Sequence, residues 1–437
     1  MNEYNKINKD KFVFVQDNIE IKEEAMKTKP VGLYKDAWRR FTKNKASLIS
    51  LIIVGILVLM VIIGPYMRNY TLFDRDAKTA NRISNLVPRI PGLEHLGIAD
   101  GTKIVDDLSK EFVERMQQSE YGRGTVIKIV SERLIGGKEY CSIKVNHYKY
   151  VDYINSIETP TGTVPTITLN EAQYNEALKK GYVISLVSEN YGEYKTQVRF
   201  FEFALGQKAE NVYFWFGTTG QGKDYFTVLW DAGRTSLLMA VSITVVNIII
   251  GVILGSIAGY FGGNVDLIFE RVTDILANLP FMAILTLLLL RFGTTTWIVL
   301  IAFTMTGWIS SYSVTRSQFY RYKNREYVLS SRTLGASDAR IMYKHIFPNA
   351  SGTLITSVSL AIPSFMFTES TYSFLGIINY SNTSSIGKLL STGQAEMQNN
   401  FHLVLFPALF ISILMICFNL MSNGLRDAFN TSLRGVE

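Results

Sequence analysis

Long apolar runs alternate with short polar segments along this chain, and the lengths of the runs separate membrane-spanning parts from soluble ones. A helix needs about 20 apolar residues to cross a hydrocarbon core about 30 Å thick. Runs of that length predict six spans, over residues 47–67, 235–259, 272–290, 296–315, 352–376 and 402–424. Pro280 interrupts the third run, which predicts a break in that span. The pattern is typical of an all-α polytopic membrane protein.

Residues 68–213, between the first two spans, contain no run long enough to cross a membrane. Their periodicity predicts strands and helices, with strands over 126–130 and 143–148 and helices over 106–118 and 170–180. Gly181 is expected to end the second helix. The stretch is long enough to bury a core of its own. We therefore expect an α+β domain inserted between the first and second spans.

Basic residues cluster on one side of the predicted membrane. Five of them precede the first span, at Lys35, Arg39, Arg40, Lys43 and Lys45. With the aromatic residues between them they predict an amphipathic helix at the membrane interface over 31–46, within a cytoplasmic segment 1–46. Six spans then return the C-terminal tail, 431–437, to the cytoplasm and leave 68–213 outside the cell. This orientation follows the positive-inside rule.

The composition agrees with a membrane protein that has a large soluble part, since hydrophobic residues make up 48% of the chain. Cys141 and Cys417 lie far apart, and none of the four histidines is paired at ligand spacing. Neither a disulfide framework nor a metal site is therefore predicted. His95 and His147 belong to no motif that fixes a nucleophile, a base and an orienting group. We expect no cofactor and no enzymatic activity on this chain.

Residues 217–223 mimic a phosphate-binding loop. Gly217, Gly222 and Lys223 have P-loop spacing, and in a P-loop the glycines let backbone amides approach phosphate. Asp224 stands where a Ser or Thr would bind Mg²⁺, and its carboxylate would repel phosphate. The predicted topology also places this segment outside the cell. Nucleotide binding is therefore not expected here.

The segment 325–349, REYVLSSRTLGASDARIMYKHIFPN, is the one long polar and basic stretch of the C-terminal half. It predicts a helix, a tight turn and a second helix. Gly335 can take the positive φ that closes a helix. Ser337 and Asp338 suit the start of the next helix, and Pro348 is expected to stop it. A plain solvated loop would need none of these helix-starting and helix-ending residues. A DNA-binding helix-turn-helix unit is not expected between two membrane spans, so no nucleic-acid partner is predicted.

This segment resembles the EAA loop of ABC-importer permeases, most closely that of the oligopeptide/dipeptide permease family. The matching positions are Arg325, Glu326, Tyr327, Val328, Arg332, Leu334, Gly335, Ala336, Ser337, Ile341, His345, Ile346, Pro348 and Asn349. The triplet Leu329-Ser330-Ser331 stands where Glu-Ala-Ala is usual. The resemblance extends over residues 31–67 and 214–430, so 214–430 is interpreted as a permease core.

The resemblance implies a type I ABC-importer permease fold and the second, C-type, permease subunit of an oligopeptide or dipeptide importer. In such a machine an extracellular substrate-binding lipoprotein delivers peptide, two paralogous permeases form the pore, and two cytoplasmic ATPases bind ATP and Mg²⁺. The loop 325–349 would couple this chain to the ATPases. The residues expected to carry the coupling are Glu326, Arg332, Leu334, Gly335, Ala336, Ser337, Asp338, His345 and Pro348. The resemblance does not cover the insert, 68–213, which we expect to dock a substrate-binding protein or to cover a gate.

Glu369 is an ionisable residue inside a predicted span. A charge near the bilayer centre costs about 2.5–3.5 kcal/mol on insertion scales, so this carboxylate should face protein or water. It is interpreted as a residue of the translocation pathway or gate, or as an outer-interface carboxylate paired with the partner subunit. Asp274 is a second pathway candidate, or a solvated interfacial residue.

Two alternatives remain open. The pore residues do not reveal specificity, so the same machine could carry nickel chelates or oligosaccharides. The chain could also be a membrane-anchored receptor or ectodomain enzyme, with residues 68–213 as its active part. Association with two ATPase subunits would exclude that second alternative.

Overall fold

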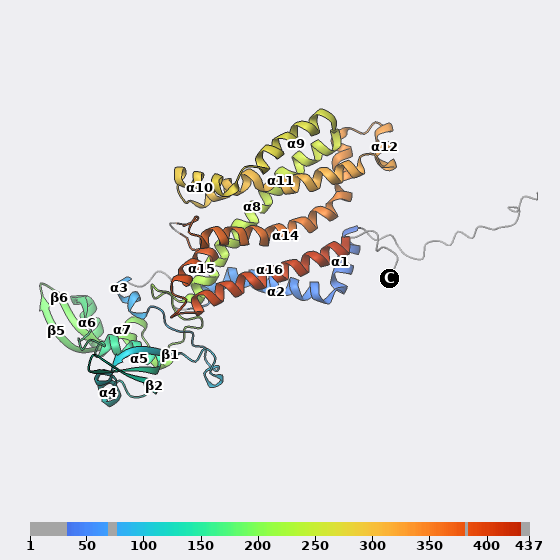
Figure 1. Ribbon diagram of the computed structural model, residues 1–437. Helices are drawn as coiled ribbons and strands as arrows, with labels where there is room; N and C mark the ends of the chain where they lie inside the picture. Colours follow the sequence, from blue (N-terminus) through green and yellow to red (C-terminus); the bar gives the residue numbers. More distant parts are fainter. Residues whose placement is uncertain (1–32, 69–76, 381–382, 430–437) are drawn as a thin grey trace, which may run out of the picture.

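The computed structural model describes residues 33–68, 77–380 and 383–429. Long helices run side by side, and a smaller part built of strands and short helices lies at one end of them (Figure 1). The predicted N-terminal segment up to residue 32, residues 69–76 of the insert and the tail 431–437 lie outside the described residues.

Within the described residues, five helical segments are long and apolar enough to cross a membrane. Their main helices are α2 (Lys45–Ile63, continued by the 3-10 turn η3, Gly64–Tyr66), α8 (Tyr225–Phe261), α11 (Thr296–Tyr322), α14 (Phe347–Phe374) and α16 (His402–Phe429). A sixth candidate is the pair α9 (Gly263–Ala277) and α10 (Phe281–Phe292), whose axes meet at 73°. The predicted break at Pro280, between these two helices, is confirmed.

The helix α8 begins at Tyr225, well before the predicted span 235–259. Asp224 caps it, because its carboxylate accepts hydrogen bonds from the backbone N–H (3.4 Å) and the hydroxyl (2.7 Å) of Thr227. With 37 residues, α8 is about 55 Å long at 1.5 Å per residue. It is therefore long enough to extend well beyond a hydrocarbon core of about 30 Å.

Glycines on one face of α8 allow α11 to pack closely against it. They are Gly251, Gly255 and Gly259, one every four residues. A Cβ atom at Gly255 would lie only 2.6 Å from the carbonyl oxygen of Tyr312 on α11. Small residues at such spacing bring helix backbones together, and dispersion contacts then stabilise the pair in lipid.

Four further helices belong to the helical part, namely α1 (Leu33–Lys43), α12 (Glu326–Thr333), α13 (Asp338–Arg340) and α15 (Ile386–Ala395). The helix α1 falls within the segment 31–46 that was predicted to be an amphipathic helix. Its apolar residues Ala37 and Phe41 are buried beside Ala428 near the end of α16, while Arg39 stays exposed. One face of α1 therefore packs on protein.

The part between α2 and α8 contains two antiparallel three-stranded sheets. The first has the order β1-β3-β2, with β1 (Thr102–Ser109), β2 (Val126–Ile135) and β3 (Lys138–Asn146). The second has the order β4-β6-β5, with β4 (Ile167–Asn170), β5 (Val183–Asn190) and β6 (Glu193–Val198). The helices of the part between α2 and α8 are α3 (Ala77–Ala80), α4 (Lys110–Gln118), α5 (His147–Ser156), α6 (Glu171–Lys179) and α7 (Phe200–Leu205). Its 3-10 turns are η4 (Asn81–Ile83), η5 (Glu94–Leu96) and η6 (Ala209–Asn211). Buried aromatic residues such as Phe112, Tyr148 and Phe200 form its core.

Local capping explains where the predicted elements of this part are right or wrong. The helix predicted over 170–180 is confirmed as α6, since Asn170 and Gln173 form a capping box. The strand predicted over 143–148 is wrong in its last two residues, because Asn146 caps α5 and ends β3. The helix predicted over 106–118 is wrong before Lys110, since Thr102–Ser109 is a strand that pairs with β3.

The turn 217–223 fastens this inserted part to the start of α8. The hydroxyl of Thr218 donates to the carbonyl oxygen of Ile83 (2.6 Å) and accepts from the N–H of Leu86 (2.8 Å). A Cβ at Gly222 would lie 1.7 Å from the carbonyl oxygen of Ala80. The glycines of the P-loop-like motif therefore lie against protein backbone, where they leave no room for a phosphate.

The two ends of the segment 90–213 lie next to each other. The N–H of Arg89 donates to the carbonyl oxygen of Phe214, 2.8 Å away. A second link joins this part to the helices, because the ammonium of Lys103 donates to the side-chain oxygen of Asn400 (2.9 Å), just before α16.

Candidate functional site

The segment 325–349 folds as predicted into a helix, a tight turn and a second helix. It lies at the end of the long helices away from the strands, where α12 is labelled (Figure 1). Gly335 has φ +81°, as predicted. Its N–H donates to the carbonyl of Arg332, and the N–H of Ala336 donates to that of Ser331. These two bonds form a Schellman motif, which closes α12 by satisfying its last carbonyls.

Pro348 does not stop the second helix, so that prediction is wrong. The helix α13 runs into η7, a π-helical turn (Ile341–Ile346), and then directly into α14, which gives one helical segment over Asp338–Phe374. Pro348 falls in the first turn of α14, where a missing N–H is tolerated. The wide turn accommodates the change, because the N–H of Phe347 donates to Met342, five residues back.

Tyr260, in the last turn of α8, joins both sides of the Gly335 turn. Its hydroxyl donates to the carboxylate of Asp338 (2.5 Å) and accepts from the guanidinium of Arg332 (3.0 Å). The guanidinium also lies over the Tyr260 ring, 5.5 Å from its centroid. The hydrogen bond to Tyr260 raises the pKa of Arg332, which keeps this side chain cationic. The turn is thus tied to the end of α8.

An apolar cluster packs the two short helices on either side of the same turn against α8 and α11. Val328 of α12, together with Ile341 and Ile346 of η7, is fully buried against Tyr260 and Phe319, the latter on α11. The two short helices therefore pack on the ends of two long ones. We call residues 325–349, with this packing, the coupling unit, after the role that the resemblance to the EAA loop implies.

The coupling unit presents large side chains to solvent. Leu334, beside the turn, is 87% exposed and Tyr343 is 78% exposed. Glu326 and Ser337 are also exposed, while His345 is half-buried. Ser337 holds the cap position of α13 but makes no capping hydrogen bond. Exposed apolar side chains on a rigid unit favour contact with another protein.

An ion-paired group beside the coupling unit holds α9 to α11. The guanidinium of Arg316 contacts the carboxylate of Asp266 at 2.5 and 2.7 Å and that of Glu270 at 3.3 Å. A bidentate pair of this kind has a defined geometry as well as charge attraction. Neither Arg316 nor Tyr260 was given a role from the sequence. The acidic residues four apart on α9 were the available signal for the pair.

Glu369 is buried among serines where α8, α14 and α15 meet. Its side chain is 3% exposed and accepts hydrogen bonds from Ser236 of α8 (3.2 Å) and Ser373 of α14 (3.1 Å). Ser236 also accepts from the N–H of Ile386, at the start of α15 (3.1 Å). The carboxylate therefore lies within this chain, and its hydrogen bonds position α15 relative to α8.

Asp274 lies elsewhere, on α9. It is exposed and makes a 3.6 Å ion pair with Arg271 on the same helix. The structure thus does not bring the two predicted pathway carboxylates together.

Two family models match the chain. One, described as "Binding-protein-dependent transport system inner membrane component", matches residues 251–435. The other, described as "N-terminal TM domain of oligopeptide transport permease C", matches residues 32–88. The two matches lie on either side of the sheets, one over α1 and α2 and the other from the end of α8 to α16.

Relatives with curated names agree with these matches. The oligopeptide transport system permease protein OppC of Bacillus subtilis is 40% identical over 220 residues, which cover 50% of this chain and 72% of that protein. The dipeptide transport system permease protein DppC of the same organism is 38% identical over 221 residues, covering 50% and 69%. A solved MetNI methionine ABC transporter chain matches with a TM-score of 0.35 at 14% identity, covering 46% of this chain and 96% of that one, which is too distant to support a structural argument. The chain therefore belongs to the oligopeptide/dipeptide permease family of ABC transporters.

Proposed function

We propose that this chain is one of two paralogous permease subunits of an ATP-driven importer of oligopeptides or dipeptides. The solute is supported by the names of its relatives, which are permeases of oligopeptide and dipeptide transport systems. In this proposal α9 and α10 form one broken span, which makes six spans in all. Both termini then lie in the cytoplasm, and residues 68–213 lie outside the cell. ATP and Mg²⁺ would be held by two cytoplasmic ATPase subunits.

The attachment of the Gly335 turn to Tyr260 carries the coupling proposal. Alternating access needs an element whose two positions are biased by the state of the nucleotide. A force on the exposed Leu334 would pass through Arg332 and Asp338 to Tyr260, because hydrogen bonds join them. From there it would act on α8 as a whole.

The other predicted coupling residues have distinct tasks in this proposal. Leu334 enters a cleft of the ATPase subunit, and Glu326 and Ser337 form polar contacts around it. Gly335 and Ala336 make the turn tight through the two bonds of the Schellman motif. His345 and Pro348 shape the passage from the coupling unit into α14.

On the outer side, the inserted part would contact a substrate-binding lipoprotein. Glu369 would act in gating by setting the position of α15, since its serine partners connect α15 to α8. Asp274 stays a predicted pathway residue on the separate helix α9.

Uptake of labelled di- and tripeptides by cells that lack this gene tests the proposal. We expect the wild-type chain to restore uptake and Gly335→Glu to fail at equal membrane levels, because a side chain at positive φ strains the turn and a charge disturbs docking. The matched control is Gly137→Glu, in the β2–β3 turn. Both glycines have positive φ (+81° and +79°), and an added Cβ meets nothing within 4 Å at either position.

The outcomes separate the parts of the proposal. Wild-type uptake of a nickel chelate or an oligosaccharide, with none of any peptide, would replace the peptide by another solute. Normal peptide uptake by Gly335→Glu would contradict coupling through this turn. Purification of the chain without ATPase subunits, from cells that express the whole system, would favour the receptor or ectodomain-enzyme alternative.

A further inference from the structure

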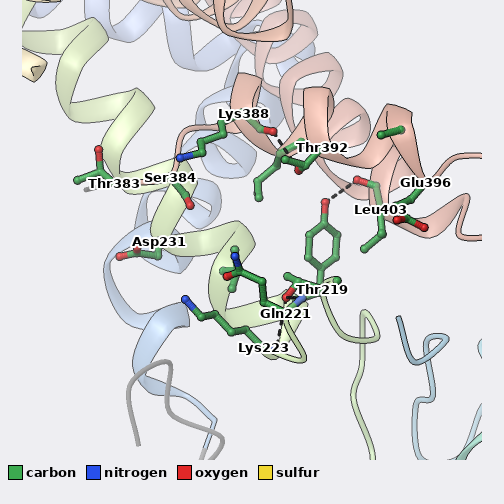
Figure 2. Close-up of a pocket in the computed structure, with 15 residues that line it drawn as sticks. Thr219, Gln221, Lys223, Asp231, Thr383, Ser384, Lys388, Thr392, Glu396 and Leu403 are labelled. Atoms are coloured by element: carbon green, nitrogen blue, oxygen red, sulfur yellow. Dashed lines mark hydrogen bonds between the residues drawn. The ribbon is translucent and has the colours of Figure 1, made fainter. Parts of the chain in front are cut away.

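We propose that a pocket beside the start of α8 binds the carboxylate end of a peptide. The pocket lies between the turn 219–223, the first turns of α8 and the helix α15 (Figure 2). Its volume is about 610 Å³, which is within the range of small-ligand sites. It lies at the opposite end of α8 from Tyr260 and the coupling unit. The inference rests on the proposed function, because it names where the imported peptide is held.

Two lysines give the pocket positive charge. The ammonium groups of Lys223 and Lys388 point to the same side of it (Figure 2). Lys388 donates to the carbonyl oxygen of Tyr380 (2.7 Å), so two of its three donors remain for a ligand. Lys223 is exposed, and its ammonium has no hydrogen-bond or ion-pair partner among the described residues. One ammonium group comes from the turn before α8 and the other from α15, so both walls offer positive charge to a carboxylate.

The acidic residues of the pocket already have partners in the chain. Asp231 is ion-paired with Arg234, one turn along α8. The carboxylate of Glu396 accepts a hydrogen bond from the side-chain amide of Asn400 (3.2 Å) and lies on the other side of the pocket (Figure 2). Asp231 is balanced by Arg234, so on the side of the pocket away from Glu396 the two ammonium groups are in excess and favour an anion over a cation.

The start of α15 adds to this preference. Thr383 and Ser384 line the pocket directly before Ser385, which caps α15 through the N–H of Lys388. A helix N-terminus carries partial positive charge and stabilises an anion nearby. The apolar residues Val228 and Leu389 line the same space, so it can also hold a small side chain.

The inserted part holds both walls of the pocket. The turn that carries Lys223 lies on residues 80–86, where Gly222 touches the backbone at Ala80. Near the other wall, Lys103 donates to Asn400, whose amide donates to Glu396 (2.9 and 3.2 Å). The insert therefore sets the separation of the two walls, and its attachment makes the pocket a rigid site.

Direct binding to the assembled permease pair in lipid nanodiscs, without ATPases or binding protein, tests the inference. The probes are labelled alanine peptides of two, three and five residues, each with a free carboxylate or a C-terminal amide. We expect Lys223→Met to raise the Kd of the free acids about tenfold, as expected for one lost charge-assisted hydrogen bond. Lys223→Arg should stay near wild type. Lys179→Met, at an exposed lysine of α6, is the control and should change nothing.

The amides provide the decisive comparison. They should bind the wild type about tenfold more weakly than the acids, and Lys223→Met should not weaken them further. Equal binding of acids and amides, an unchanged Kd in Lys223→Met, or no binding to the wild type would each overturn the inference. In a second assay with the lipoprotein added, a Lys223→Met variant that binds peptides normally but no longer binds the lipoprotein would also overturn the inference, because the pocket would then be a protein-docking site. Peptide uptake by wild-type cells decides the proposed function separately.

Discussion

Tyr260 at the end of α8 donates a hydrogen bond to Asp338, 78 residues later in the chain, at the first position after the coupling turn. The same hydroxyl accepts from Arg332 on the other side of that turn. One phenol group thus holds the turn closed against a helix that reaches the opposite end of the bundle. The consequences for transport can be measured residue by residue.

Replacing Tyr260 by Phe removes both hydrogen bonds and keeps the ring. Hydrogen bonds to charged groups contribute about 1.5–3 kcal/mol each, so peptide uptake is expected to fall on the order of tenfold at unchanged membrane levels. Tyr191→Phe is the control, because it removes an exposed hydroxyl in the turn between β5 and β6, away from the coupling unit. Wild-type uptake in Tyr260→Phe would contradict a role for this link.

The conformation of Gly335 predicts a graded series. A residue with a Cβ at φ +81° costs about 1–2 kcal/mol, less for Asn and more for a β-branched residue. We therefore expect uptake to decrease in the order Gly, Asn, Ala, Val. An added Cβ meets nothing within 4 Å, so a clash cannot produce this order. Equal uptake by the Val and Asn variants would show that the backbone conformation is irrelevant.

The close contact of α8 and α11 predicts sensitivity to a single methyl group. Gly255→Ala would place a Cβ 2.6 Å from the carbonyl of Tyr312 and should lower the free energy of unfolding by about 1–3 kcal/mol. Gly55→Ala on α2 meets nothing within 4 Å and should be neutral or slightly stabilising. Thermal unfolding of both variants in detergent checks this, and equal stability would refute the packing argument.

Glu369 provides a test of the buried polar contact with α15. Glu369→Leu removes every acceptor and leaves the hydroxyls of Ser236 and Ser373 without their partner, at a cost of about 2–3 kcal/mol. Glu369→Gln keeps one oxygen and the size, so it should lose much less stability and retain most uptake. Loss of uptake in Glu369→Gln at wild-type stability would instead indicate that the charge itself acts in the pathway.

His147 makes the stability of the insert depend on pH. Burial, followed by the charges of Lys103 and His402, lowers its pKa from 6.5 to about 3, and its Nδ1 accepts from the N–H of Val87. Between these values the unfolded chain binds a proton that the folded chain does not. Above pH 6.5 the imidazole is neutral in both states and costs the folded chain no stability. As the pH falls from 6.5 toward 3, the free energy of unfolding decreases by up to about 1.4 kcal/mol per pH unit.

Thermal unfolding between pH 7 and pH 4 measures this loss. His147→Asn keeps an acceptor without the titration, so its stability should change less with pH than that of the wild type. His95→Asn, at an exposed position of the same part, is the control and should follow the wild type. Parallel curves for wild type and His147→Asn would contradict the assignment.

Apolar run length and local turn chemistry were enough to predict much of this fold. The break at Pro280, the positive φ of Gly335 and the capped helix after Asn170 were all predictable, because each depends on residues within one turn. The helix α15 was not predicted, since its ten residues are too few to span a membrane.

Most of the features that were not predicted depend on contacts between distant segments. Nothing near Tyr260 in the sequence indicates Asp338, and nothing near Lys103 indicates Asn400, because tertiary packing creates both pairs. Pro348 was misjudged because a π-helical turn before it shifts the hydrogen bonds by one residue. The strand β1 replaced the first residues, 106–109, of a predicted helix because pairing with β3 outweighs local propensity.

The hydrogen bond between Arg89 and Phe214 brings the two ends of the intervening sequence together. A chain that enters and leaves a segment at one point tolerates changes in the length of that segment. The match to the N-terminal TM domain of oligopeptide transport permease C ends at residue 88, immediately before Arg89. Residues 80–86, which cover the turn 217–223, would remain after an excision of 90–213. A shortened permease made by such a cut should therefore keep the turn 217–223 covered, whereas a cut starting at residue 68 would uncover that turn.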